Sequence, residues 1–142
     1  MRGKEGFTLI ELMAIICIVL ALTVTIAPRI RDFYRKQQLD VAIQELATDL
    51  KIARNRAKTQ REERRVVIMD SNYVIINIAN NSIEKNRTFT GVTFTSGVPV
   101  DITFDRNGMI SRPVIITGAR CGVPSQTLHI NSLGRVSRVV CY

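Results

Sequence analysis

Hydrophobic and polar residues divide the chain into stretches of different character. Residues 7–26 are apolar, apart from a few threonines and a single carboxylate, Glu11. A helix of this length measures about 30 Å, which matches the hydrocarbon core of a bilayer. We therefore predict a membrane-spanning helix over residues 7–28. A charge inside such a helix is costly, so we expect Glu11 to have a functional role.

A secretory signal peptide or an ordinary membrane anchor is the alternative interpretation of this segment. A signal peptide has a shorter apolar region, and a cleavage site of small residues follows it. In this chain a glycine, Gly6, precedes the apolar run, and no A-x-A pattern comes after it. The order of these features argues against a signal peptide.

The next segment, residues 29–65, has the hydrophobic period of an amphipathic helix. Apolar residues recur at alternating steps of four and three, which places them on one face. These residues are Leu39, Ile43, Leu46, Leu50, Ala53 and Ala57. Pro28 lacks an amide donor, so we expect a kink where the two helical segments meet. The apolar face is predicted to pack on the protein's own sheet, and a seam for partner helices is the alternative.

From Val66 to the C-terminus the pattern becomes that of short strands. Strand-like runs occur at residues 66–69, 73–78, 88–95, 100–104, 114–117, 127–133 and 136–141. Turn residues separate them, including Asp70-Ser71-Asn72 and Asp105-Arg106-Asn107-Gly108. One long helix followed by consecutive antiparallel strands is an α+β arrangement, with a β-rich head over residues 66–142.

The segment Gly6-Phe7-Thr8-Leu9-Ile10-Glu11-Leu12 resembles the processing motif of type IV prepilins and type II secretion pseudopilins. The resemblance implies a leader peptide over residues 1–6, cut by a prepilin peptidase between Gly6 and Phe7. Phe7 then becomes a methylated N-terminus, and Pro28 matches a proline near the end of the family's apolar segment. The implied location is the bacterial inner membrane, spanned once, with the head in the periplasm. The implied partners are inner-membrane lipid, the assembly platform and other subunits of a pilus or pseudopilus.

Glu11 has a physical role in this setting. The amine of the processed Phe7 carries a positive charge, which a carboxylate on a neighbouring helix can neutralise. Such an attraction is far stronger among packed apolar helices than in water, and it can set the register of subunits during assembly. A protonated or snorkelling Glu11 is the alternative.

Three later segments resemble the GspH/FimT group of minor pilins and pseudopilins. They are residues 50–57 at the helix end, residues 102–108 in the middle of the head, and residues 133–136 near the C-terminus. The group includes secretion pseudopilins, pilus-tip subunits and DNA-binding pilins used in natural transformation. The resemblance implies a pilin-like fold and a structural subunit of a pilus or pseudopilus.

DNA binding is the alternative function. The net charge is +8 and the isoelectric point is near 10.0. DNA-binding members have a Gly-Arg-x-Arg motif, and this chain has Gly134-Arg135-Val136-Ser137-Arg138, with the second arginine one position later. In a strand that shift moves a side chain to the opposite face, whereas in a loop both arginines can point outward. Arg112 and Arg120 are candidates for the same patch, and a set of ordinary solvated arginines is the alternative.

The cysteines predict one disulfide and no metal site. Cys121 and Cys141 belong to the part of the chain expected in the oxidising periplasm. A bridge between them would close a loop of about 20 residues, worth about 3 kcal/mol in the chain-entropy description. Two free thiols are the alternative. Cys17 is most simply a small apolar residue of the membrane helix. We expect no metal, because only two cysteines and one histidine remain outside that helix.

An enzyme is the contrasting class of protein. His129, the single histidine, occurs in a strand-like run, and no motif places Asp101, Asp105 or Ser111 beside it. Catalysis would require a polar pocket around His129, so the sequence favours a protein without catalytic residues or cofactor.

Overall fold

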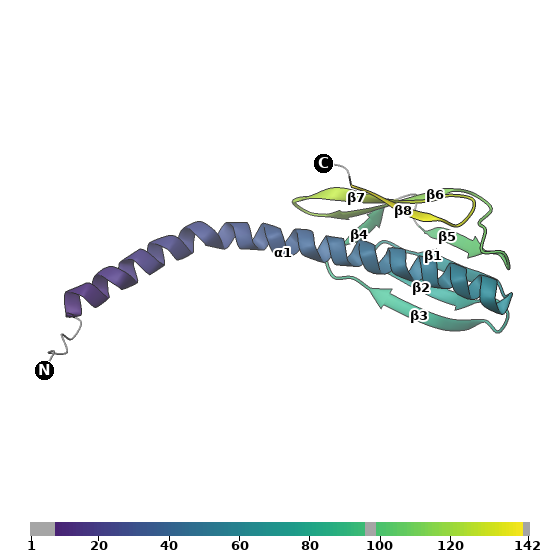
Figure 1. The fold of residues 1–142 in the computed structure, drawn as a ribbon, viewed down its shortest axis with the longest axis horizontal. Helices are drawn as coiled ribbons and strands as arrows, with labels where there is room; N and C mark the ends of the chain where they lie inside the picture. Colours follow the sequence, from purple (N-terminus) through teal and green to yellow (C-terminus); the bar gives the residue numbers. More distant parts are fainter. Residues whose placement is uncertain (1–7, 96–98, 141–142) are drawn as a thin grey trace, which may run out of the picture. The chain divides into compact units, whose positions relative to one another are not determined.

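The computed structural model describes residues 8–95 and 99–140, without the side chains of residues 24–29 and 140. The chain forms two compact units, Met1–Tyr34 and Arg35–Tyr142. Helix α1 (Leu9–Gln60) begins in the first unit and continues into the second, and eight strands follow it (Figure 1). The strands are β1 (Arg64–Ile68), β2 (Asn72–Asn77), β3 (Ser82–Thr88), β4 (Thr93–Thr95), β5 (Val100–Phe104), β6 (Val114–Arg120), β7 (Val123–Ile130) and β8 (Val136–Val140).

Local interactions mark both ends of α1. At its start, the amide of Glu11 donates to the carbonyl of Thr8 at 3.1 Å and to the Thr8 hydroxyl at 3.3 Å. These bonds satisfy an amide that has no partner within the helix. After Gln60, Arg61 has a φ of 55°, the left-handed conformation with which helices commonly end. The helix thus stops several residues before residue 65, the predicted end, and β1 begins at Arg64.

The strands form two separate antiparallel sheets of four. The strand order is β3-β2-β1-β5 in the first sheet and β4-β6-β7-β8 in the second. In the first sheet Val66 pairs with Ile75 of β2 and with Ile102 of β5. In the second sheet Leu128 of β7 pairs with Ile116 of β6 and Arg138 of β8.

The second half of α1 packs against both sheets, and one core joins all three layers (Figure 1). The residues predicted for the apolar helix face are at most 1% exposed; they are Leu39, Ile43, Leu46, Leu50, Ala53 and Ala57. Side chains of both sheets complete the core, among them Val66, Ile68, Ile102, Phe104, Ile116 and Leu128. The predicted α+β class, with a long helix packed on an antiparallel head, is confirmed.

Several of the strand expectations differ from the structure. The run predicted at residues 127–133 is β7, which covers Val123–Ile130. Residues 88–95 were predicted as one strand, but β3 ends at Thr88 and β4 covers only Thr93–Thr95. Strand β3 was not expected, because Ser82–Thr88 lacks the apolar alternation of a half-buried strand. It is an edge strand that pairs only with β2, so few of its side chains need to be apolar.

The predicted membrane segment falls partly outside the described residues, since it includes residue 7 and the side chains of residues 24–29. Helix α1 passes through Pro28, and the kink expected there stays a prediction. Within the described parts of the chain, no helix combines the length and the hydropathy needed to cross a membrane.

Candidate functional site

The first turns of α1 present an exposed apolar surface within the first unit. Leu9 and Ile10 are 78% and 75% exposed. The other large apolar side chains exposed here are Leu12, Met13, Ile15, Ile16, Ile18, Val19, Leu20 and Leu22. Because water solvates such a surface poorly, it is suited to contact with lipid or with other helices.

Glu11 lies in the first turn of α1, within this apolar surface, and its side chain is exposed. A carboxylate near a helix N-terminus is favoured by the unpaired amide groups there. Gly6 and Phe7, the predicted cleavage and methylation positions, lie outside the described residues. Pairing between the Phe7 amine and Glu11 therefore stays a prediction.

The guanidinium of Arg138 is held by two polar side chains of the head, those of Asp40 and Gln126. Arg138 lies in β8 opposite Leu128, and its guanidinium forms an ion pair with Asp40 of α1. The same nitrogen donates to the side-chain oxygen of Gln126 at 2.6 Å, and Gln126 in turn donates to Asp40. This cluster ties the edge strand β8 to the helix.

The other three candidate arginines have different surroundings. Arg135 is exposed in the turn before β8, where its amide donates to the side chain of Asn131 at 2.8 Å. Arg120, at the end of β6, donates to the carbonyl of Thr90 at 3.2 Å. Arg112 is exposed beside β5, in the wall of a hollow of about 490 Å³. Because β8 begins at Val136, Arg135 and Arg138 do not belong to one loop.

Arg54 brings together the three segments that resemble the GspH/FimT group. Its Nε donates to the carbonyl oxygens of Gly108 and Leu133, both at 3.1 Å. A Cβ added to Gly134 would lie 2.3 Å from the carbonyl oxygen of Gly108, so the two turns are also in close contact with each other. Residues 50–57, 102–108 and 133–136 thus meet at one end of the head.

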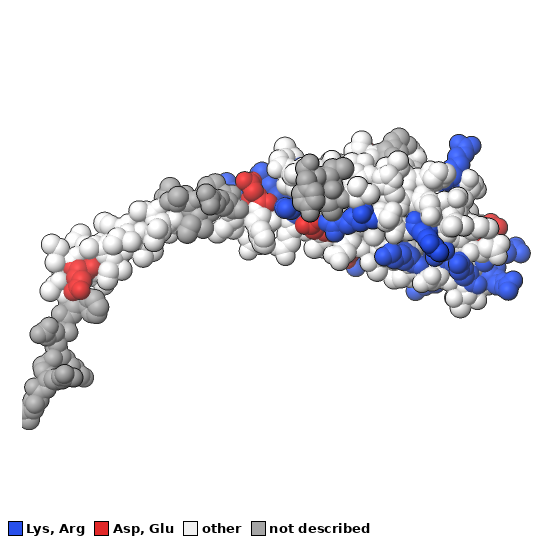
Figure 2. Space-filling model, turned by 45° about the horizontal axis from the view of Figure 1, so that its top comes forward, with Lys and Arg blue, Asp and Glu red and all other residues white. Residues whose placement is uncertain are grey.

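A basic surface lies at this end of the head. Three cations share one face of the last turns of α1, and a fourth follows directly after the helix. We call them the basic row: Lys51, Arg54, Lys58 and Arg61. The exposed Arg106 and Arg135 come from the two turns that Arg54 holds. Figure 2 shows Lys and Arg side chains gathered over this end of the head. The members of the row occupy other positions than the apolar face of the helix. No local pattern in the sequence indicates that the turn arginines lie beside them.

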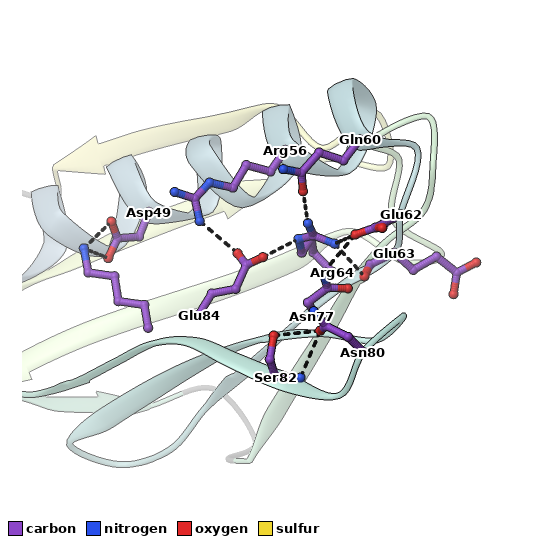
Figure 3. A network of polar contacts seen from close by, with 11 residues as sticks. Asp49, Arg56, Gln60, Glu62, Glu63, Arg64, Asn77, Asn80, Ser82 and Glu84 are labelled. Atoms are coloured by element: carbon purple, nitrogen blue, oxygen red, sulfur yellow. Dashed lines mark hydrogen bonds and ion pairs between the residues drawn. The ribbon is translucent and has the colours of Figure 1, made fainter.

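A second polar cluster joins α1 to the first sheet (Figure 3). Arg64, only 1% exposed, forms ion pairs with Glu84 at 2.9 Å and with Glu62 at 3.0 Å. Glu84 also pairs with Arg56 of α1 at 3.0 Å. The hydrogen bond from Asn77 to Glu62, followed by the one from Arg64, lowers the pKa of the Glu62 carboxyl. The charges of Arg56, Glu62, Arg64 and Glu84 are paired with one another, which is typical of a structural role.

Asp49 is the centre of a smaller buried cluster. Lys85 approaches its two oxygens at 2.7 and 2.6 Å, and the Tyr73 hydroxyl donates to it. Burial and the hydrogen bond to Asp49 raise the pKa of Tyr73 far above its ordinary value. A neutral Tyr73 thus helps to hold α1 against β2.

The cysteines and the groups that could bind a metal complete the candidate residues. Cys121 is exposed, and Cys141 lies outside the described residues, so the predicted disulfide stays a prediction. Cys17 is exposed on the apolar part of α1. Within the described ranges, no three His, Cys, Asp or Glu side chains are grouped so that they could hold a metal ion.

His129 is exposed on β7 and is separate from the polar residues considered beside it. Asp101 forms an ion pair with Arg65 at 3.4 Å, and Asp105 accepts hydrogen bonds from amides of its own turn. Asp101, Asp105 and Ser111 line two surface hollows, neither of which His129 lines. The arrangement does not assemble the catalytic group considered for an enzyme.

No protein-family model and no curated protein sequence matches the chain. Solved structures do resemble it. The type IV minor pilin FimU of Pseudomonas aeruginosa superposes with a TM-score of 0.63 at 21% identity, over 78% of this chain and 99% of that chain. The minor pseudopilin EpsH from the type 2 secretion system of Vibrio cholerae superposes with a TM-score of 0.58 at 14% identity, over 72% of this chain and 97% of that chain. The chain therefore has the fold of type IV minor pilins and of type II secretion minor pseudopilins.

Proposed function

We propose that the chain is a structural subunit, without enzymatic activity, of a type IV pilus or a type II secretion pseudopilus. The observation that carries the proposal is the exposed apolar surface of α1 over residues 9–22, interrupted only by Glu11, on a chain with the minor pilin fold. FimU is a type IV minor pilin and EpsH is a minor pseudopilin of a type 2 secretion system, which supports such a role for this chain.

In this proposal the N-terminal segment has two successive environments. Before assembly it is anchored in the inner membrane, with residues 29–142 on the periplasmic side. A prepilin peptidase removes residues 1–6 and methylates the new terminus at Phe7. The assembly platform then moves the subunit into a fibre, where helices of other subunits replace lipid on the apolar surface.

Glu11 is the proposed register element in that fibre. It is the one acid on the exposed apolar surface, and burying it among helices without a partner would be costly. The amine of Phe7 on a neighbouring subunit supplies the opposite charge. A subunit displaced along its neighbour would lose this pair, so the pair favours one register.

The substitution Glu11→Val tests this role. We expect the variant to enter the inner membrane normally and to be recruited into fibres much less than the wild type. Ile18→Val is the matched control, since it changes an exposed apolar side chain of the same helix and leaves the charge unchanged. Fractionation of membranes and sheared fibres, followed by immunoblotting, measures both steps. Undiminished recruitment of Glu11→Val would count against the pairing.

A DNA-binding minor pilin that acts in natural transformation is the second candidate. The observation favouring it is the exposed Arg135, in the turn that Arg54 of the basic row holds through the carbonyl of Leu133. The proposed C-terminal arginine loop receives less support, because Arg138 is engaged by Asp40 and Gln126. Loss of DNA uptake on deletion of the gene, with pilus formation retained, would support this candidate.

A further inference from the structure

We infer that the basic row, together with Arg106 and Arg135, forms a contact surface for the phosphate backbone of duplex nucleic acid. The inference rests on the second function proposed above, and it assigns the contact to the face of α1 instead of strand β8. Three members of the basic row lie in the last turns of α1, and Arg61 follows directly after the helix. The turns that carry Arg106 and Arg135 flank the row.

Within residues 8–95 and 99–140, the cations of this surface have no ion-pair partners, and they outnumber the two carboxylates nearby, Glu63 and Asp105. Most other carboxylates of the head form ion pairs with Lys or Arg side chains. These pairs include Asp40–Arg138, Glu45–Arg87, Asp49–Lys85, Glu62–Arg64, Glu84–Arg64 and Asp101–Arg65. By contrast, Lys51, Lys58 and Arg61 form no side-chain hydrogen bond or ion pair with any residue that the structure describes, and the same is true of Arg106 and Arg135. Unpaired like charges at one end of a domain raise the local potential and attract a polyanion.

The cations also have a linear arrangement. From Lys51 to Lys58 the helix rises by about 10 Å at about 1.5 Å per residue, and Arg61 extends the row just beyond the helix end. Duplex DNA carries one charge per about 1.7 Å of its axis, so a row of this length lies opposite several phosphates. Arg54 holds the two turns against the row, which adds Arg106 and Arg135 in a fixed position.

The chemistry of the surface favours a duplex over a single strand or a membrane. Single-strand sites stack bases on aromatic side chains, and neither the row nor the two turns contain an aromatic residue. The exposed apolar residues nearby, Met109 and Leu133, line a hollow that also contains Glu63 and Asp105. Because they line a hollow and do not project from a continuous apolar face, these apolar side chains are poorly placed to insert into a membrane surface.

The test uses the full chain in non-ionic detergent and a fluorescently labelled duplex of arbitrary sequence, with anisotropy measured over a range of salt concentrations. The row variant is Lys51→Gln/Lys58→Gln/Arg61→Asn. Asparagine is chosen at position 61 because it tolerates the left-handed backbone there. Arg54 is kept because it holds the turns. We expect the row variant to bind at least about tenfold more weakly, with the slope of log K against log salt reduced by about 0.9 for each lost contact.

A charge-matched control is Arg31→Gln/Lys36→Gln/Arg112→Gln, which removes three exposed cations outside the basic surface. It should bind nearly as tightly as the wild type, and thermal unfolding should confirm that both triple variants remain folded. Equal weakening by the two triple variants would show that net charge alone attracts the duplex, and this result would overturn the inference.

Two further outcomes would also overturn it. One is loss of binding in Arg135→Ala/Arg138→Ala while the row variant still binds, which would assign the contact to the C-terminal segment. The other is preference of the wild type for a single strand over a duplex of equal length. If the wild type binds no nucleic acid, this inference and the second candidate function both fail. The assembly function would be unaffected, because the Glu11→Val recruitment experiment tests it separately.

Discussion

Arg54 in helix α1 donates a hydrogen bond to the carbonyl oxygen of Gly108, 54 residues further along the chain. The same Nε reaches the carbonyl of Leu133, so one side chain holds two turns that belong to different parts of the head. The helix therefore determines where both turns lie, and with them the position of the basic surface.

Replacing Arg54 with alanine should destabilise the head. The change leaves two carbonyl groups without a charged donor, and bonds to charged groups contribute about 1.5–3 kcal/mol each. Since Arg54 is partly exposed, we expect a total loss near the lower end, about 1.5–2 kcal/mol. Lys51→Ala is the control, and as an exposed change without a partner it should remain within about 0.5 kcal/mol of the wild type. Denaturant unfolding measures both, and equal values for the two variants would contradict the proposed role of Arg54.

Gly134 and Gly91 form a matched pair for testing the contact between the turns. Both have left-handed backbones, with φ of 68° and 73°, so an alanine suffers similar strain at either position. A Cβ at Gly134 would lie 2.3 Å from the carbonyl oxygen of Gly108, whereas at Gly91 it would meet the flexible side chain of Arg120 at 3.4 Å. We expect Gly134→Ala to cost about 1–3 kcal/mol more than Gly91→Ala, because backbone atoms must move. Similar thermal midpoints for the two variants would mean that the turns separate easily.

The raised pKa of Tyr73 predicts that the folded protein loses stability at alkaline pH. Because this pKa is raised in the folded protein, the neutral phenol stabilises the fold fully at pH values below the unfolded pKa near 10.0. As the pH rises further, this contribution is lost at up to about 1.4 kcal/mol per pH unit. Tyr73→Phe should show a shallower decline in unfolding free energy above about pH 10, although it is less stable at neutral pH. Tyr34→Phe, at an exposed tyrosine, should keep the wild-type decline; an unchanged decline in Tyr73→Phe would refute the assignment.

The pair formed by Asp40 and Arg138 should show measurable coupling. In a double-mutant cycle with alanine we expect about 0.5–1 kcal/mol, at the upper end for partly exposed pairs. The reason is that Gln126 binds both partners and their side chains are only 34% and 32% exposed. The control cycle is Arg65 with Asp101, at 50% and 48% exposure, for which we expect a value near zero. Equal coupling in the two cycles would show that Gln126 adds nothing.

The sequence predicted the features that depend on local periodicity. The apolar face of α1 was correct at every residue because helical spacing alone decides which side chains share a face. Strand β5 was predicted with its observed bounds, Val100–Phe104, since its apolar residues alternate between turn residues. Strand β3 was missed because an edge strand with little buried surface has no such alternation.

The features that depend on distant contacts could not be predicted. Arg138 meets Asp40 across 98 residues, and Arg54 meets Leu133 across 79. No local pattern distinguishes an arginine that binds a carbonyl from one in solvent, so the sequence treated Arg135 and Arg138 as equivalent. The fold separates them, because β8 begins between them and places Arg138 opposite a buried leucine.

The packing of α1 against both sheets has a mechanical consequence. In the described parts of the chain no strand belongs to both sheets, so the core side chains that the helix contributes from Leu39 to Ala57 are a main connection between them. A pull along the axis of the helix would load these contacts in shear, all at once, whereas a pull on an edge strand would break its hydrogen bonds one pair at a time. The head is thus arranged to resist tension applied along its helix, which is the direction of load in the fibre proposed above.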